Sequence, residues 1–195
     1  MPLSCIVCGK DNARGVTCID CRKRTLLRGL VAVGPYGSTS LKRGVHWFKF
    51  KGVKGLADPL AKLLIPRLNI IGPLASLQKE AVLIPVPLHK RRLRQRGFNQ
   101  SLEIARVLER YTGIPVMDIL IRRKATWTQT KLPSELREGN VSDAFSLEEI
   151  SGLENRRLQI IVDDVATTGS TLSAAAKPLK EVGAEEVWGV TIARG

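Results

Sequence analysis

The stretch that most constrains the fold runs from Ile160 to Leu172. Three apolar residues, Ile160 to Val162, precede two adjacent carboxylates, Asp163 and Asp164, and a short loop of small hydroxyl residues then leads into an amphipathic segment. A short apolar run that ends in polar residues is typical of a buried strand in a parallel sheet, and the segment after it is typical of a helix. The sequence therefore predicts at least one strand, loop and helix unit of an α/β fold.

The rest of the chain continues this alternation. Helices are predicted over Ser101–Tyr111 and Thr171–Val182, each followed by a glycine that suits a helix end. The region Leu41–Leu68 has helical spacing that is interrupted near Gly52 and Gly55. Right-handed crossovers between parallel strands, with helices on both faces, are the expected topology. The predicted strands are Leu30–Val33, Ala81–Pro85, Gln159–Val162 and Val187–Ile192, with a weaker one at Ile114–Leu120.

Composition narrows the class of protein further. The chain has 195 residues, of which 44% are hydrophobic, and a net charge of +13. Its apolar residues come in short clusters, which excludes a disordered tail, a coiled coil, a solenoid and a membrane-spanning helix. We expect a cytoplasmic protein without membrane insertion. Its excess positive charge, concentrated in residues 1–54, favours phosphate-bearing partners, although basic surfaces also serve solubility.

The four cysteines lie together near the start of the chain. Cys5 and Cys8 form one CxxC pair, and Cys18 and Cys21 form a second. Two such pairs suit a closed tetrahedral site for a structural Zn²⁺ ion, with iron as the alternative metal. We therefore predict two units, a zinc-ribbon-like module over residues 1–35 and a main α/β domain over residues 36–195.

The loop after the acid pair has the features of a phosphate site. The free N–H groups and the positive dipole end of a helix N-terminus attract anions, and Gly169 permits close approach of the backbone. Asp163 and Asp164 would repel a phosphate, so they are expected to face hydroxyl groups or a cation beside it. A sugar phosphate fits both halves of the site. The alternative is that the acids only end a strand and that Thr167 only caps a helix.

Basic residues gather in two further places. Lys90–Arg96 follows a predicted strand and would emerge at the same sheet edge as Asp163, where its arginines could bind pyrophosphate or a nucleic-acid backbone. Trp47, Phe48 and Phe50 alternate with lysines, a pattern that suits base stacking, although such rings are often needed in the core. The candidate nucleic-acid contacts are Lys49, Lys51, Arg91 and Arg94.

These motifs resemble those of the competence protein F family, whose main domain is of the type I phosphoribosyltransferase fold. The resemblance rests on the stretch Ile160–Leu172, on Pro85-Val86-Pro87-Leu88 with Arg96-Gly97-Phe98-Asn99-Gln100, and on Phe48-Lys49-Phe50-Lys51-Gly52 behind four cysteines. Further matching positions are Thr126, Gln129, Leu132, Arg137, Asn140, Val141, Ala144 and Phe145. Two departures are Ala166, where the family more often has a larger aliphatic residue, and Leu136, where an acid is common.

The resemblance implies a role for each part of the site. The ligand would be phosphoribosyl pyrophosphate (PRPP) with Mg²⁺, or a ribose phosphate, with its ribose hydroxyls on Asp163 and Asp164. Residues 122–143 would form a mobile hood over it. The implied PRPP-binding residues are Asp163, Asp164, Ala166, Thr167, Thr168, Gly169, Ser170 and Thr171, and the implied pyrophosphate-binding residues are Pro85, Val86, Pro87, Arg92 and Arg96.

Two classes of function remain open at this stage. One is a phosphoribosyltransferase, for which the sequence assigns no individual catalytic residue. The other is a binding protein for single-stranded DNA in which PRPP is a regulatory ligand. The family resemblance implies a link to DNA uptake in natural transformation, with proteins of the uptake machinery as partners.

Overall fold

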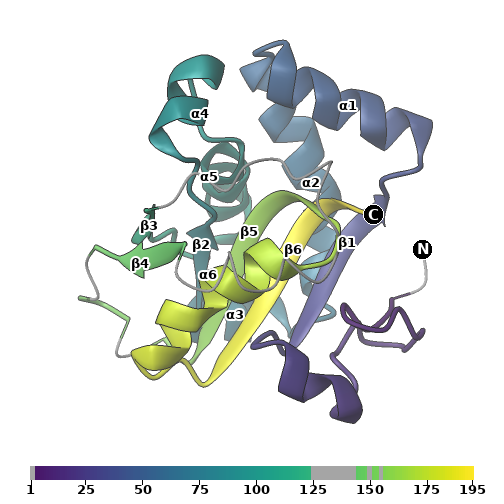
Figure 1. The fold of residues 1–195 in the computed structure, drawn as a ribbon, viewed down its shortest axis with the longest axis vertical. Helices are drawn as coiled ribbons and strands as arrows, with labels where there is room; N and C mark the ends of the chain where they lie inside the picture. The colour runs from purple at the N-terminus through teal and green to yellow at the C-terminus, as the bar shows by residue number, and fades with distance from the viewer. Residues whose placement is uncertain (1–2, 124–143, 149–150, 154–155) are drawn as a thin grey trace.

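The computed structural model describes residues 3–123, 144–148, 151–153 and 156–195. Its centre is a four-stranded parallel sheet in the order β1-β6-β5-β2 (Figure 1). These strands are β1 (Gly29–Pro35), β2 (Ala81–Pro85), β5 (Leu158–Ala166) and β6 (Glu186–Arg194). The fold class is therefore α/β, as the alternation of apolar runs and amphipathic segments predicts.

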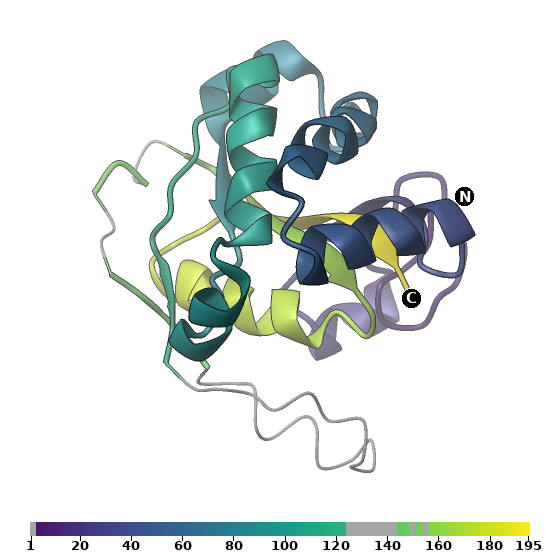
Figure 2. The same ribbon diagram turned by 90° about the horizontal axis from the view of Figure 1, so that it is seen from above.

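Helices cover one face of the sheet. They are α1 (Thr39–Phe50), α2 (Ala57–Leu68), α3 (Leu74–Glu80) and α5 (Gln100–Thr112). Their buried side chains, among them Phe48, Leu64 and Leu108, pack against Ile160 and Val190 of the central strands. Figure 2 shows α2 and α5 on this side and α6 (Ser170–Glu181) on the other.

The opposite face is covered by α6 and by a small antiparallel pair, β3 (Leu120–Arg122) with β4 (Phe145–Leu147). Leu172 and Leu179 of α6 pack with Ile84 and Ile161 of the sheet. The short helix α4 (Lys90–Arg96) buries none of its residues. In the part of the chain that is described, no helix combines the length and the apolar character needed to cross a membrane.

One predicted strand forms only in part. Of the range Ile114–Leu120, only Leu120 belongs to a strand, while Val116 makes a single bridge to Leu83 of β2. Pro115 has no N–H group, so this segment contacts β2 through just two bonds, from Leu83 N to Pro115 O and from Met117 N to Leu83 O.

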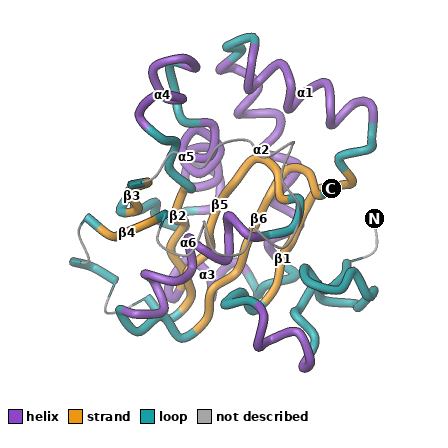
Figure 3. Tube along the Cα trace, viewed as in Figure 1, coloured by secondary structure: helices purple, strands orange, loops and turns teal. Residues whose placement is uncertain are grey.

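The N-terminal residues form a compact unit beside the sheet. Figure 3 shows them mostly as loop, with one short 3₁₀ helix, η1 (Ile19–Arg24). Strand β1 pairs with β6, so the main sheet begins at Gly29 and includes residues that the sequence-based division at residue 35 assigns to the module. We therefore use "cysteine module" for residues 3–28.

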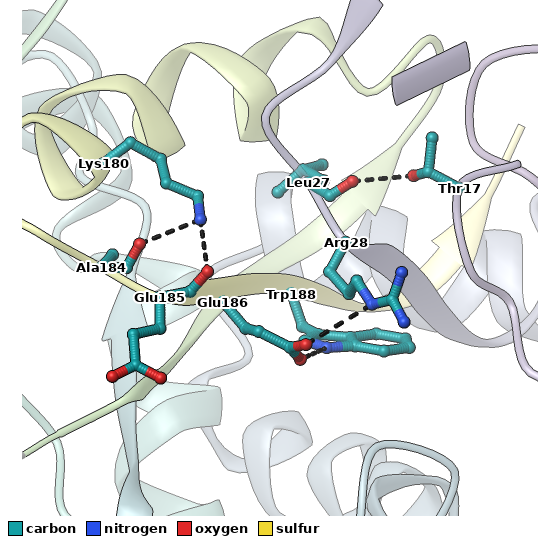
Figure 4. A network of polar contacts seen from close by, with 8 residues as sticks. All are labelled: Thr17, Leu27, Arg28, Lys180, Ala184, Glu185, Glu186 and Trp188. Atoms are coloured by element: carbon teal, nitrogen blue, oxygen red, sulfur yellow. Dashed lines mark hydrogen bonds and ion pairs between the residues drawn. The ribbon is translucent and has the colours of Figure 1, made fainter. Parts of the chain in front are cut away.

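Polar contacts tie the cysteine module to the adjacent end of the sheet (Figure 4). Arg28 Nε of the module lies 3.5 Å from Glu186 Oε1 of β6, while the bond from Thr17 Oγ1 to Leu27 O, at 2.8 Å, lies within the module. The same Glu186 side chain accepts from Trp188 Nε1 at 3.3 Å. The module also borders strand β1, because Leu30 N donates to Gly15 O at 3.0 Å.

Candidate functional site

The acid pair lies inside strand β5 rather than after it. Asp163 is level with Thr191 of β6, and the pairing continues to Ala166 beside Arg194. Side chains do not decide where a strand ends if the backbone ladder continues, which explains why β5 extends beyond the predicted Val162. The loop from Thr167 to Gly169 then leads into α6. The carboxylates and the loop therefore meet at the carboxyl edge of the sheet, where open α/β folds bind ligands.

The two carboxylates have different partners. Asp163 Oδ1 accepts hydrogen bonds from Ser101 Oγ at 2.9 Å and from the backbone N of Asp164 at 2.8 Å. Asp164 is 5% exposed, and its Oδ1 lies 2.8 Å from Lys49 Nζ of α1. Burial, with the neighbouring Asp164 charge, raises the pKa of Asp163 to about 7 although Lys49 opposes the rise. Asp163 therefore carries only part of its negative charge at neutral pH.

The loop after β5 presents hydroxyl groups at the start of a helix. Thr167, Thr168 and Ser170 are exposed, and Thr168 Oγ1 donates to Ser170 Oγ at 3.0 Å. Gly169 precedes α6 with a φ of +76°, a conformation that favours glycine. The first turn of α6 contains no acidic residue, which favours an anion at this helix start.

Arginines surround the acid pair. Arg96 at the end of α4 donates through Nη1 to Gln100 Oε1 at 3.0 Å. Burial lowers the pKa of Arg96, while the charges of Asp164 and Asp163 raise it. Burial likewise lowers the pKa of Arg122, on which Arg92 and Asp163 also act. Arg96 and Arg122 thus lie within electrostatic reach of the acid pair, and Arg92 lies within reach of these two arginines.

The turn Pro85-Val86-Pro87 supports this site but offers no donor of its own. Pro85 and Pro87 have no N–H group, and the N–H of Val86 donates to Val162 O at 2.9 Å. Asn99 Nδ2 further fixes the turn by donating to Val86 O at 3.1 Å. In this conformation, the arginines rather than the turn's backbone are the donors available to a pyrophosphate.

Helix α4 carries the basic cluster that follows β2. His89 caps it by accepting from Arg91 N at 3.3 Å, and Gly97 ends it. Arg91 and Arg94 are exposed, whereas Arg92 and Arg96 are partly buried. Because β2 and β5 are neighbouring parallel strands, α4 lies at the same edge as Asp163, as the sequence predicts.

The aromatic cluster on α1 is divided between core and surface. Phe48 is fully buried and lies 5.4 Å from Phe98, ring centre to ring centre, so it belongs to the core and is unsuited to base stacking. Trp47 and Phe50 are 49% and 63% exposed. Arg43 lies over the Trp47 ring at 5.9 Å, and Arg96 lies over the Phe50 ring at 5.3 Å.

Two lysines at the end of α1 also differ in exposure to solvent. Lys51 is exposed, but Lys49 is paired with Asp164. The sequence pattern predicts both as nucleic-acid contacts, whereas the structure directs Lys49 into the acid pair. Ser101 and Arg122 are further members of the site that sequence reasoning did not single out. Their connection to Asp163 arises only when α5 and β3 fold against the sheet.

The four cysteines converge as their spacing predicts. All four sulfur atoms lie within 4.8 Å of one another, and Cys8 Sγ is 3.7 Å from Cys18 Sγ. Cys5 is buried, but N–H groups of Cys8, Cys18 and Val7 outweigh that burial and lower its pKa to about 6. Thiols that lie this close cannot all ionise unless a cation joins them. The cluster could therefore hold a metal ion.

The cysteine module touches the hydroxyl loop directly. A Cβ atom added at Gly169 would lie 2.4 Å from Ile6 Cδ1, so the Ile6 side chain rests on this glycine. Arg194, at the end of β6, donates to Ser4 O at 2.9 Å, to Ser4 Oγ at 2.8 Å and to Cys5 O at 2.7 Å. On α6, Ser173 Oγ accepts from Thr25 Oγ1 at 3.2 Å.

A cleft of about 390 Å³ lies between α4, α5 and β3, and neither residue of the acid pair lines it. Its lining mixes apolar and charged side chains, and burial raises the pKa of Asp118 within it. The lining includes Leu93, Phe98, Glu103, Asp118 and Arg122. The hood expected over residues 122–143, with Thr126, Gln129, Leu132, Arg137, Asn140 and Val141, lies outside the described residues except at its start.

The parallel sheet, the acid pair and the hydroxyl loop before α6 define a phosphoribosyltransferase-type domain. In agreement, the family model described as "Phosphoribosyl transferase domain" matches residues 95–195.

Comparison with curated proteins assigns the chain more narrowly. It is 36% identical over 149 residues to "Competence protein F" of Haemophilus influenzae, covering 75% of this chain and 65% of that protein. It is 37% identical over 163 residues to "DNA utilization protein YhgH" of Salmonella typhimurium, covering 82% and 70% respectively. "Competence protein ComFC" of Bacillus subtilis is 28% identical over 186 residues, covering 92% and 72%. The chain belongs to the competence protein F family of phosphoribosyltransferase-domain proteins.

Proposed function

We propose that this chain binds PRPP with Mg²⁺ at the carboxyl edge of β5, in a protein that serves DNA uptake. The observation that carries the proposal is that Asp163 and Asp164 are followed closely by the exposed hydroxyl groups of Thr167, Thr168 and Ser170 at the start of α6. Carboxylates accept hydrogen bonds from the ribose hydroxyls, while the start of α6 binds the 5′-phosphate. The names of the relatives, which refer to competence and DNA utilization, support the link to DNA.

The pyrophosphate group would lie toward α4. Arg92 and Arg96 supply guanidinium groups that bind phosphate oxygens through paired hydrogen bonds. Mg²⁺ bound with the ligand would neutralise part of the pyrophosphate charge. If turnover occurs, an acceptor nucleophile forms a bond to C1 of the ribose as the bond from C1 to pyrophosphate breaks, and the arginines stabilise the charge that develops on the departing oxygens. That step requires no covalent nucleophile from the protein.

Calorimetric titration with PRPP and Mg²⁺ tests this proposal. Asp164→Asn should weaken binding by about 1 to 3 kcal/mol, because an amide supplies one acceptor oxygen where the carboxylate supplies two. Asp58→Asn is the matched control, since Asp58 lies on α2 and pairs with Lys62. Equal PRPP affinity of Asp164→Asn and the unaltered protein, with the fold intact, would place the ligand elsewhere.

We propose Zn²⁺ as the metal of the cysteine module. A tetrahedral site with Zn–S bonds of about 2.3 Å separates neighbouring sulfurs by about 3.8 Å, close to the 3.7 Å between Cys8 and Cys18. Metal analysis of the purified protein should find about one zinc per chain, and Cys18→Ser should lower this content sharply. Stoichiometric iron in place of zinc would contradict the assignment.

A second candidate function is binding of single-stranded DNA, with PRPP as a regulatory ligand. It is favoured by the exposed rings of Trp47 and Phe50, each beside an arginine, and by the exposed cations Lys51, Arg91 and Arg94. Bases stack on such rings while cations neutralise the backbone. Helices α1 and α4 lie at the same end of the molecule (Figure 1), so one strand could contact both.

The salt dependence of DNA binding separates the two candidates. The logarithm of the affinity should fall with the logarithm of salt concentration by about 0.7 per neutralised phosphate. Replacing Arg91 and Arg94 by Ala should flatten this slope. Replacing Arg22 and Lys23 of η1, at the opposite end of the molecule, removes the same charge as a control. If both double variants bind DNA alike, α4 is not a DNA contact.

A further inference from the structure

The ion pair between Lys49 and Asp164 has the geometry of a contact made in place of a ligand. Lys49 lies in the last turn of α1, and its side chain is 20% exposed, while that of Asp164 is 7% exposed. Their 2.8 Å separation joins residues from opposite ends of the chain at the candidate ribose site. The ammonium group therefore occupies one of the two oxygens of a carboxylate that is proposed to accept from the ribose hydroxyls.

The surroundings of Lys49 offer a second position for its charge. The charges of both carboxylates of the acid pair act on Arg96. The Arg96 guanidinium group also lies over the ring of Phe50, the residue that follows Lys49. Arg92 belongs to the same group of cations, since its charge acts on Arg96. Lys49 pairs with Asp164, whose charge also acts on Arg96, so the ammonium group and the Arg96 guanidinium group act on the same carboxylate. A lysine is suited to such an exchange because its charge is carried on a flexible four-carbon stem.

We propose that Lys49 determines specificity for the pyrophosphate-bearing form of the ligand. This inference rests on the proposed function. Without ligand, Lys49 neutralises Asp164 and blocks it. A ribose phosphate that lacks pyrophosphate must displace the ammonium group and gains nothing in return. PRPP displaces it as well, but the freed ammonium group then binds the pyrophosphate oxygens, so the displacement is compensated only for PRPP.

The test compares two ligands that share the ribose and the 5′-phosphate, namely PRPP and ribose 5-phosphate, both titrated at the same Mg²⁺ concentration. The measured quantity is the ratio of their affinities. In Lys49→Gln, ribose 5-phosphate should bind more tightly and PRPP more weakly, so that the ratio in favour of PRPP falls about tenfold or more. A merely structural role for Lys49 would shift both affinities in the same direction and leave the ratio unchanged.

Lys42→Gln is the matched control, because it removes the same charge from the same helix at an exposed position. Its ratio should stay within about threefold of the unaltered protein. Lys49→Arg should keep most of the preference, and Lys49→Met provides a second uncharged variant if Lys49→Gln unfolds. An unchanged ratio in the uncharged variants would overturn the inference. Failure of the unaltered protein to bind either ligand would overturn the proposed function instead.

Discussion

Asp163 and Asp164 are adjacent in β5, yet only Asp164 has a cation as its direct partner. Asp163 accepts from a hydroxyl and from an amide, both of which are neutral donors. Its charge is therefore poorly compensated, and burial raises its pKa to about 7. A carboxyl whose pKa is higher in the folded state than in the unfolded state weakens the fold as the pH rises from about 4 to about 7.

Asp163→Asn should remove this pH dependence. The amide keeps an acceptor oxygen for Ser101, and it resembles the protonated carboxyl. We expect equal unfolding free energies for the variant and the unaltered protein near pH 4. Near pH 8, where Asp163 is ionised, the variant should be more stable by on the order of 2 kcal/mol. Urea unfolding at a series of pH values measures the difference.

Asp58 provides a control of opposite sign. Its side chain pairs with Lys62 at 2.7 Å, and this hydrogen bond lowers the pKa of Asp58. The stability it contributes is present at neutral pH and is lost as the pH falls below the ordinary aspartate range. Asp58→Asn should therefore lose a little stability at neutral pH and none in strong acid. If Asp163→Asn, like Asp58→Asn, lost stability at neutral pH and none in strong acid, that result would contradict the raised pKa of Asp163.

At the scale of elements, the contact between the cysteine module and the hydroxyl loop depends on a single glycine. Gly169 has a positive φ and no room for a Cβ atom, because Ile6 lies 2.4 Å from the position that atom would take. Gly183, after α6, also has a positive φ of 96°, but a Cβ atom there would meet nothing within 4 Å. A substitution at Gly183 therefore introduces backbone strain alone, whereas one at Gly169 introduces both backbone strain and a packing clash.

Gly183→Ala should cost about 1 kcal/mol of stability through backbone strain alone. Gly169→Ala should cost about 2 to 4 kcal/mol, since the methyl group also pushes Ile6 away from the loop. Thermal unfolding of the two variants provides the comparison. The packing explanation predicts that Gly169→Ala combined with Ile6→Ala recovers part of the loss, and a double variant as unstable as the sum of both changes would speak against it.

Most elements could be predicted from local pattern. Strand β2 has the predicted bounds, and α5 and α6 begin one residue before their predicted starts. These segments have clear apolar periodicity and glycine stops, so their own residues determine them. The convergence of the cysteines is confirmed for the same reason, because CxxC spacing acts over a few residues.

Long-range features could not be predicted in this way. The extension of β5 through Asp163 and Asp164 depends on pairing with β6. The contact of Lys49 with Asp164 depends on how α1 packs over the sheet, and alternating lysines and aromatics indicate nothing about which lysine turns inward. For the same reason, the burial of Phe48 and the exposure of Phe50 could not be told apart before α1 had a position.

For the whole molecule, Arg194 is the main polar connection between the last strand and the cysteine module. Its guanidinium group makes three hydrogen bonds to Ser4 and Cys5, and it is partly buried. Arg194→Met keeps the length of the side chain but removes all three. We expect a loss of about 2 kcal/mol in stability and faster transfer of any metal ion held by the cysteines to a chelator.

Arg28→Met is the appropriate control for that experiment. Arg28 also connects the module to the sheet, through Glu186, but both side chains are substantially exposed, at 37% and 52%. An exposed ion pair contributes little, so the variant should release metal at nearly the original rate. Equal release rates for Arg194→Met and Arg28→Met would show that Arg194 does not hold the module.

The strand order also determines when the sheet can form. Within the described sheet, strand β1 pairs only with β6, so Val31 cannot pair until Val190 has been synthesised. Strand β2 likewise cannot pair until β5 has been synthesised. On a ribosome, both edge strands emerge long before the central pair that must lie between them. Pairings of such long sequence separation form slowly and leave apolar strands exposed in the meantime. The cysteine module has been synthesised by then, because its four cysteines all precede β1 in the chain. If these cysteines hold a metal ion, the folded module lies beside β1 until β6 is made.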